Sequence, residues 1–426
     1  MHWFWSGLLG FIAFGWLLAA IDLARGAIVI PALSRYQNQL RPAEAGGATY
    51  RLGTAESQDG SPCGAVHKST SSGSACADPK NTAGGLPRVS ILFSALDEAE
   101  KLPAALASFQ AQDYPDFEVV AVDDRSEDAT GSILDAAARA DSRLKVVHVT
   151  SLPAGWLGKP HGMRTAFEHS TGEWLVFTDA DVRFQPDVLH STIALAQQRH
   201  LDHLTLLCHA EMFTVGEKIA MTFFALAFLM GLRPWRASDP RSSAYVGVGA
   251  FQLIRRDAYE KMGTHRRLAM EVVDDVKLGK LVKVAGLRSG VAKAGRAVSV
   301  HWHAGLGNII RGTTKNCYAT TGFRLWVAAG QVFGFLLMFV FPWIALPFVH
   351  GWARIFAAVA IVLPVLAQVG AALEFEESPL YAVTQPLGAL IFVWMIVRST
   401  FVTLRQGGIY WRGTFYPIEE LKRGVV

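Results

Sequence analysis

Four long, predominantly apolar stretches constrain this chain more than any other feature of its sequence. They run from Trp3 to Ile30, Leu325 to Val349, Trp352 to Leu373 and Leu380 to Leu404. Each is about long enough to cross the hydrocarbon core of a bilayer, which takes roughly 20 helical residues. The hydrophobic share of 51% and the mean hydropathy of +0.25 exceed what a water-soluble surface tolerates. The sequence therefore predicts a multi-pass membrane protein.

The first apolar stretch is interpreted as a retained anchor over residues 1–36. It lacks a basic segment at its start, it is too long for a cleaved signal peptide, and no small-x-small site precedes Arg35. Residues 37–87 are rich in Gly, Ser, Ala and Thr without periodicity, which predicts a flexible linker. The four cysteines are Cys63, Cys76, Cys208 and Cys317. Since they form no C-x-x-C pair, a reducing compartment is expected and a zinc site is not.

The charge distribution indicates a membrane location and no nucleic-acid partner. The net charge of +4 is small and spread along the chain, without the basic stripes that bind nucleic acid. Basic residues from Arg35 onward place the region after the anchor in the cytoplasm, so we expect a cell (inner) membrane protein. Basic residues in 405–426 also favour a cytoplasmic tail. With the N-terminus outside, four crossings would place this tail outside as well. One apolar segment would therefore re-enter the membrane or lie in its interface.

Between the apolar ends, residues 88–324 alternate short apolar runs with amphipathic ones, which is typical of an α/β domain. We place strands at Val89 to Ser94, Phe117 to Val122, Leu144 to Val149 and Glu173 to Thr178. Helices are expected at Glu98 to Gln110, Asp128 to Ala138, Pro160 to His169 and Asp187 to Arg199. Such a domain binds its ligand at the carboxyl ends of its strands. Residues 325–404 would then form the C-terminal transmembrane helices, and 405–426 a juxtamembrane tail.

One further apolar run, Ile219 to Leu232, is about fourteen residues long. That length suits a helix lying in the membrane interface better than one that spans the bilayer. A helix buried in the core of the domain explains the run equally well.

Two acidic pairs follow predicted strands and indicate a divalent cation. Asp123-Asp124 ends the second strand and Asp179-Ala180-Asp181 the fourth, so both pairs are expected at one edge of the sheet. Crowded carboxylates are costly unless a cation offsets them. Mg²⁺ or Mn²⁺ takes one or two carboxylates and completes its shell with water and diphosphate oxygens. A solvated loop is the alternative reading of an isolated D-x-D.

These motifs, in this order, resemble family 2 inverting glycosyltransferases. The resemblance covers roughly residues 88–318 and rests on Asp97-Glu98 after the first strand, Val122 to Asp128, Asp179-Ala180-Asp181 and Ala154 to His161. The last segment, with its G-W-x-G-K sequence, is similar to ceramide glucosyltransferase-like and hopanoid- or carotenoid-associated members. The resemblance implies an α/β fold of the GT-A (Rossmann-like) type with N-terminal and C-terminal transmembrane helices.

The resemblance also implies a role for each matching residue. It assigns the nucleoside, uridine, to Asp97 or Glu98 and to Asp124 with its neighbour Asp123, the ribose to Asp179, the metal to Asp181 together with Asp179, and the diphosphate to Lys159. A lysine suits that place because its ammonium offsets phosphate charge.

A general base is implied by the acidic pair before x-L-G in Val272 to Gly279. Asp275 matches the base of the family and Asp274 is its neighbour and possible substitute. Crowding with Glu271 would raise at least one pKa towards a useful range. The alternative is that these acids only favour the positive end of a helix.

The chain departs from the family where processive members carry Q-x-x-R-W. The comparable segment, Arg311 to Tyr318, lacks that sequence, which weakens a polysaccharide-synthase reading. Arg311 and Lys315 are four residues apart and can clamp phosphates from one helical face. His301 and His303 alternate on a strand without a third ligand, so a metal site there is not expected.

Together these features predict a membrane-bound glycosyltransferase that moves a hexose from a UDP-sugar to a lipid or lipid-linked hydroxyl with inversion. Its expected partners are a nucleotide-sugar donor, a membrane lipid acceptor and the bilayer, and its cofactor is Mg²⁺ or Mn²⁺. The alternatives are a processive polysaccharide synthase and a catalytically inactive module that binds a nucleotide sugar.

Overall fold

A computed structural model describes residues 2–37 and 85–426. Most of the linker predicted over 37–87, with Cys63 and Cys76, lies outside the described residues. Among the described residues, eight strands form one mixed sheet in the order β3-β2-β1-β4-β7-β6-β8-β5. The α/β class predicted from the sequence is therefore confirmed.

The first half of the sheet is parallel and agrees with the sequence prediction. It consists of β1 (Val89–Ala95), β2 (Phe117–Asp124), β3 (Leu144–Val149) and β4 (Trp174–Phe177). The second half of the sheet was not predicted, and its strands run in both directions. β7 (Gln252–Arg255) runs antiparallel to β4 and to β6 (His203–Ala210). β8 (Ser289–Val300) runs parallel to β6, and β5 (Val182–Phe184) forms the edge of the sheet antiparallel to β8.

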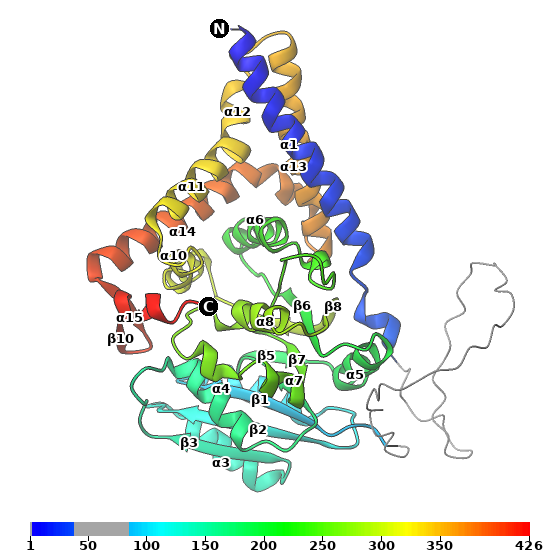
Figure 1. Ribbon diagram of the computed structural model, residues 1–426, viewed down its shortest axis with the longest axis vertical. Helices are drawn as coiled ribbons and strands as arrows, with labels where there is room; N and C mark the ends of the chain where they lie inside the picture. Colours follow the sequence, from blue (N-terminus) through cyan, green and yellow to red (C-terminus); the bar gives the residue numbers. More distant parts are fainter. Residues whose placement is uncertain (1, 38–84) are drawn as a thin grey trace, which may run out of the picture.

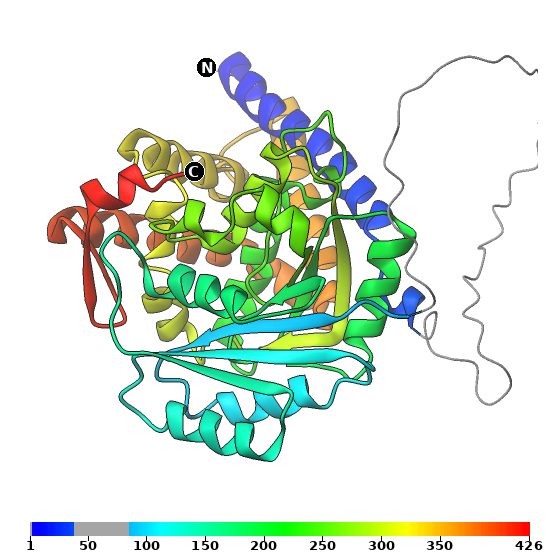
Figure 2. The same ribbon diagram turned by 60° about the horizontal axis from the view of Figure 1, so that its bottom comes forward.

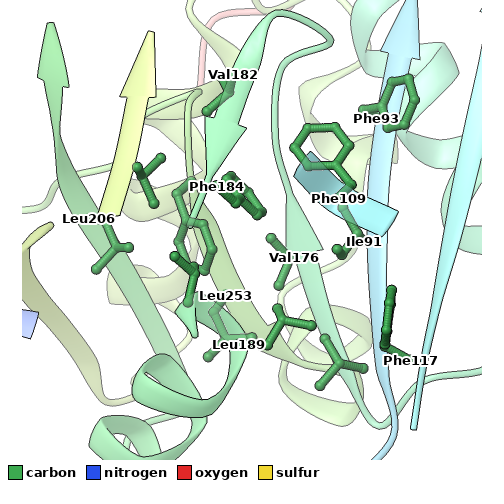
Figure 3. Packing of buried hydrophobic residues seen from close by; sticks show 14 of the residues in the cluster. Ile91, Phe93, Phe109, Phe117, Val176, Val182, Phe184, Leu189, Leu206 and Leu253 are labelled. Atoms are coloured by element: carbon green, nitrogen blue, oxygen red, sulfur yellow. The ribbon is translucent and has the colours of Figure 1, made fainter. Parts of the chain in front are cut away.

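Helices cover both faces of the sheet because buried side chains alternate along its strands. Ile91 and Phe93 of β1 pack on one face against α2 (Leu102–Gln110), α3 (Thr130–Ala140) and α5 (Val188–Gln198). Figure 3 shows Phe93, Phe109 and Phe184 in this cluster, where the ring centroids of Phe109 and Phe184 lie 4.8 Å apart. On the other face Leu92 packs against α4 (Gly158–Glu168), α7 (Arg256–Lys261) and α8 (Asp274–Val284).

Helix α2 begins four residues after the predicted start. Asp97 has a positive φ of 54°, so the chain turns there instead of entering a helix. Its carboxylate Oδ1 accepts a hydrogen bond from the amide of Glu127 at 2.8 Å. The prediction was wrong at this end because a contact thirty residues along the chain competes with local capping.

In the described part of the chain, five helices are long and apolar enough to cross a membrane. They are α1 (His2–Val29), α6 (Val215–Leu232), α11 (Leu325–Phe335) with its continuation through Leu336–Val340 into α12 (Phe341–Ala345), α13 (Trp352–Glu374), and α14 (Gln385–Gln406). Figure 1 shows α1 and α13 side by side, converging with α12 away from the sheet, while α6 is seen end-on between them and the sheet.

Helix α6 is longer than the fourteen-residue run predicted from the sequence. The hydroxyl oxygen of Thr214 accepts a hydrogen bond from the amide of Glu217 and caps the helix ahead of its apolar part. The resulting eighteen residues bury Phe223 and Leu226, whose side chains pack in one cluster with Trp16 of α1. Length alone therefore does not separate a spanning helix from an interfacial one here.

The chain returns to the sheet domain after its last long helix. A hairpin of β9 (Gly408–Trp411) and β10 (Thr414–Pro417) leads into α15 (Ile418–Arg423). Figures 1 and 2 show this tail beside α4 and α10 (Asn316–Ala319), with the end of the chain near α8. Residues more than 300 positions apart thereby meet at one edge of the sheet.

Candidate active site

The two acidic pairs lie at the same edge of the sheet, with β1 between them. Asp123 and Asp124 end β2, whereas Asp179 and Asp181 follow β4, the neighbour of β1 on its other side. Asp123 Oδ2 lies 2.9 Å from His148 Nδ1, and Asp124 Oδ1 accepts from Arg125 Nε at 2.8 Å. The pairs therefore do not share one cluster of carboxylates.

The residues predicted for the donor and for the base meet around one glycine. A Cβ placed on Gly249 would lie 2.9 Å from Asp179 Oδ2, 3.0 Å from Asp275 Oδ2 and 3.3 Å from Lys159 Nζ. Lys159 Nζ itself forms an ion pair with Asp179 Oδ1 at 2.5 Å. The segment before β7, the N-terminus of α4, the end of β4 and the N-terminus of α8 thus converge on one point.

Backbone amides fix the carboxylate of Asp275. Its Oδ2 accepts a hydrogen bond from the amide of Gly249 at 3.0 Å, and its Oδ1 accepts from the amide of Val276 at 2.8 Å. The side-chain amide of Gln252 donates to the main-chain carbonyl of Asp275 at 3.2 Å. Because three donors set its position, Asp275 keeps one orientation relative to Asp179 and Lys159.

Asp274 is almost fully buried beside the same cluster. Burial raises its pKa, and the nearby carboxylates of Asp275 and Asp179 add to that rise, while Lys159 and Lys315 oppose it. Burial alone would lower the pKa of Lys159, but Asp179, Asp274 and Asp275 outweigh it and raise that pKa. Lys159 therefore stays charged and compensates three carboxylates.

Asp181 has a cationic partner that the motifs do not reveal. Lys101 Nζ lies 3.0 Å from Asp181 Oδ2 and donates to the carbonyl of His301 at 3.2 Å. Burial raises the pKa of Asp181, with a further contribution from Asp179, and Lys101 opposes this. No local sequence signal marks Lys101, which lies just before the first turn of α2.

The tail hairpin brings one aromatic side chain, Trp411, and one basic side chain, Arg412, to the site. Lys315 Nζ lies 4.1 Å from the ring centroid of Trp411, and Arg412 Nη2 lies 2.7 Å from Glu98 Oε1. Burial and the nearby Lys159 lower the pKa of Lys315 to about 8. Burial also raises the pKa of Glu98, against the opposing effect of Arg412.

Two residues predicted for the site, Asp97 and Arg311, make their hydrogen bonds outside the cluster around Gly249. Asp97 accepts from the amide of Glu127, on the loop after β2. Arg311 is exposed and donates a hydrogen bond to Asn308 Oδ1 at 2.6 Å, whereas Lys315 lies against Trp411. The two cations therefore have different partners. His303 faces the cations Lys101 and Lys315, and burial lowers its pKa to about 4.

Asp179 and Asp181 fit a divalent cation that is shared with a bound diphosphate. Within residues 2–37 and 85–426 no group of three or more His, Cys, Asp and Glu side chains forms a complete protein site for a metal ion. A cation held by one or two carboxylates and by phosphate oxygens needs no such group. Burial raises the pKa of Asp181, and the neighbouring carboxylate of Asp179 raises it further; a bound cation would offset both effects.

Comparison with known families identifies the fold and chemistry of this part. Residues 90–263 match the family model described as Glycosyl transferase family 2. The family, the GT-A fold and the enzyme class expected from the sequence are thereby confirmed. The match contains Asp179 and Asp181 but ends before Asp274 and Asp275.

Curated relatives resemble parts of the chain. It is 24% identical over 54% of its length to the 4,4'-diaponeurosporenoate glycosyltransferase of Staphylococcus haemolyticus, of which it covers 60%. It is 31% identical over 28% of its length to the beta-monoglucosyldiacylglycerol synthase of Trichormus variabilis, of which it covers 25%. The alignments thus span less than two thirds of either relative. Among solved structures, a mannosyltransferase from Pyrobaculum calidifontis in complex with GDP-Man and Mn²⁺ has 20% identity and a TM-score of 0.48, over 92% of this chain and 98% of that one.

Proposed function

Residues 90–263 form a family 2 glycosyltransferase domain, and on that premise we propose that the protein transfers a hexose from a nucleotide sugar to a lipid hydroxyl. The donor is a UDP-sugar, the acceptor is a membrane lipid or lipid-linked molecule, and the anomeric configuration inverts. The protein resides in the cell (inner) membrane with this domain in the cytoplasm.

One observation carries the proposal: a donor-side pair and a candidate base share the space around Gly249. Atoms of Asp179, Asp275 and Lys159 all come within 3.3 Å of the point where a Cβ of Gly249 would lie. A residue of any larger size would crowd these three groups, so the glycine allows the two carboxylates and the ammonium to lie next to one another. A displacement needs its base and its leaving group to lie on either side of one reacting carbon, within reach of both.

Asp275 is the proposed general base. The amides of Gly249 and Val276 hold its two oxygens in a fixed direction. Each carboxylate oxygen keeps a second lone pair, so Asp275 can accept the proton of the acceptor hydroxyl. The deprotonated oxygen then attacks the anomeric carbon as the bond to the diphosphate oxygen breaks.

Lys159 and Lys315 are proposed to hold the diphosphate as its negative charge increases. Lys159 is charged and partly buried beside Asp179. Lys315 is held over the Trp411 ring and near Arg412. Fixed cations in a partly dehydrated site stabilise a leaving diphosphate more than solvated cations would.

Asp181 and Asp179 are the proposed ligands of Mg²⁺ or Mn²⁺. When bound, such a cation supplies positive charge to the diphosphate oxygens. The protein's own contribution is to keep both carboxylates ionised: Lys101 pairs with Asp181 and Lys159 with Asp179.

A lipid acceptor is supported by the helices and by the names of the relatives. The five candidate membrane helices of the described residues support a site that works close to a bilayer. One relative is named for a carotenoid acid and another for a diacylglycerol lipid. By analogy with these names, we assign an apolar acceptor to this protein.

The test is to incubate membranes containing the protein with labelled UDP-glucose, UDP-galactose or UDP-N-acetylglucosamine and to separate the lipid extract. We expect label from one of these donors in the lipid fraction, and none from membranes that carry a Gly249→Ala variant. Label found only in a polymer that resists lipid extraction would overturn the acceptor assignment. Donor binding without any transfer would instead indicate an inactive module.

A further inference from the structure

Helix α14 begins next to the sheet domain. Three ion pairs join the acidic turn before it to β8 and to the first turn of α6: Glu374 Oε2 with Lys293 Nζ at 2.7 Å, Glu376 Oε2 with Arg296 Nη2 at 2.6 Å, and Glu377 Oε2 with Lys218 Nζ at 2.9 Å. This turn also follows α13, so the end of α13 lies at the domain as well. Figure 1 shows α14 between that end of α13 and the tail hairpin.

The other end of α14 reaches the donor side of the same domain. The buried hydroxyl of Ser399 donates a hydrogen bond to the carbonyl of Thr314 at 2.5 Å and accepts one from the amide of Tyr318 at 2.8 Å. These bonds hold the segment that carries Lys315. The hairpin after the helix is paired with the loop after β1 through Arg412. A helix that starts and ends beside one domain does not cross a bilayer, since a single crossing separates its two ends.

One face of α14 is apolar along the whole helix and is left uncovered by the protein. Its exposed side chains are Leu387, Leu390, Trp394, Val397, Phe401 and Leu404. They recur every three or four residues, so they form a single stripe, which we call the apolar stripe of α14. The opposite face buries polar side chains, among them Gln385, Ser399 and Thr403. The helix thus turns its polar face to the domain and its apolar face away from it.

A charged residue near the middle of α14 also argues against a crossing. Arg398 is half-exposed, and among the described ion pairs none includes it. An unpaired charge is costly at the centre of a bilayer, whereas at its surface a long side chain reaches the headgroups. The other long apolar segments contain no Asp, Glu, Lys or Arg between Trp3 and Ile21, between Leu325 and Val349, or between Ile355 and Leu373.

We propose that α14 lies flat in the interface of the cytoplasmic leaflet, with its apolar stripe in the lipid and its polar face towards Thr314 and α10. The occupant of the stripe is the bilayer itself, and the choice of leaflet rests on the proposed cytoplasmic location of the domain. Crossings by α1, by α11 with α12 and by α13 then leave the N-terminus outside and the basic tail inside, as the positive-inside rule favours. Through Ser399, a helix seated on the membrane positions Lys315 for the donor.

The test measures the depth of nitroxide labels in the full chain, reconstituted in vesicles of phosphatidylcholine and phosphatidylglycerol. Depth follows from the accessibility of each label to oxygen and to a water-soluble nickel complex. The labels occupy single cysteines, Leu387→Cys or Trp394→Cys on α14, in a chain whose native cysteines are serine. These positions are seven residues apart, which is about 10 Å along a helix. We expect both labels at the same shallow depth.

Helix α13 supplies the matched control. Leu366 and Leu373 are also exposed and seven residues apart, and Leu373 lies at the end of α13 nearer the sheet domain. Since α13 crosses the bilayer, a label at Leu366→Cys should lie about 10 Å deeper than one at Leu373→Cys. The control shows that the measurement resolves a crossing helix from a flat one.

Three results would overturn the proposal. A label at Trp394→Cys about 10 Å deeper than one at Leu387→Cys would mean that α14 crosses the bilayer. Low accessibility to oxygen and to nickel at both positions would mean that a second copy of the chain covers the stripe. A tag after Val426 of the wild-type chain needs no cysteine replacement, and protease should remove it in inside-out vesicles but not in intact cells. The reverse pattern would place the tail outside. Since no readout uses sugar transfer, failure here leaves the proposed enzymatic activity untouched.

Discussion

Arg412 Nη2 lies 2.7 Å from Glu98 Oε1, although 314 residues separate the two in the chain. The contact joins the hairpin that follows the last long apolar helix to the loop that follows β1. The same hairpin places Trp411 against Lys315. The segment after the long apolar helices and the sheet domain thus both contribute side chains to one site.

Removing the charge of Arg412 should weaken donor binding. Arg412 acts electrostatically on Asp179 and Lys315, and its ion pair holds the hairpin in place. Loss of one charge-assisted contact of about 1.5 kcal/mol corresponds to about a tenfold rise in KM for the donor. Steady-state kinetics of Arg412→Ala test this, with the exposed Arg405→Ala on α14 as the control. An unchanged KM would show that the hairpin does not act on the donor.

A methyl group at Gly249 should abolish transfer with little effect on folding. It would lie 2.9 Å from Asp179 Oδ2, 3.0 Å from Asp275 Oδ2 and 3.3 Å from Lys159 Nζ, which is closer than van der Waals contact allows. Displacing these groups by even 1 Å can cost about 100-fold in rate. Gly370→Ala on α13 is the matched control, because nothing lies within 4 Å of its Cβ position. Comparable activity in the two variants would contradict the shared space around Gly249.

Donor affinity should depend on pH through Lys315. The pKa of this ammonium is lowered to about 8 in the free protein. A diphosphate favours the charged form, so it raises this pKa and binding takes up a proton above pH 8. The affinity should therefore be constant from pH 7 to about 8 and fall by up to roughly tenfold per pH unit above it.

Calorimetry with the nucleoside diphosphate checks this dependence. Lys315→Arg keeps its charge over the whole range and should give a flat profile, whatever its absolute affinity. A slope that persists in this variant would assign the titration to another group.

Metal removal should stop the reaction and Asp181 should set the metal requirement. Chelation with EDTA is expected to abolish transfer, and Mg²⁺ or Mn²⁺ to restore it. In Asp181→Asn the metal concentration for half-maximal activity should rise by about tenfold or more, because a neutral amide is a poorer ligand than a carboxylate. Glu100→Gln, an exposed neighbouring carboxylate after β1, is the control. Full activity in EDTA would contradict a metal-dependent reaction.

The four parallel strands could be predicted because each contains an apolar run, and β1, β2 and β4 are buried on both faces. The later strands were harder to predict, since polar residues interrupt their buried apolar positions. His203 on β6 is fully buried, and its ring nitrogens lie 3.0 Å from Ser289 Oγ and 3.1 Å from Gln252 Oε1. These partners are 86 and 49 residues away, so no local pattern could reveal that the histidine is satisfied.

In the candidate site, too, some residues could be predicted from local sequence and others could not. Asp179, Lys159 and Asp275 lie in ordered motifs, and the structure brings them together around Gly249. Lys101 and Arg412 belong to no motif, because their places depend on how α2 and the tail hairpin pack. Local spacing therefore predicted the carboxylates better than the cations that compensate them.

The most direct test of the account is to compare wild-type protein and Asp275→Asn in donor binding and in sugar transfer to lipid. The account predicts equal donor affinity in calorimetry, the same thermal stability, and a loss of about 10²–10⁴ in transfer rate, the usual contribution of a general base. Asp274→Asn, which changes the adjacent acid, should retain more activity than Asp275→Asn. Undiminished transfer by Asp275→Asn would contradict the central claim that this carboxylate deprotonates the acceptor.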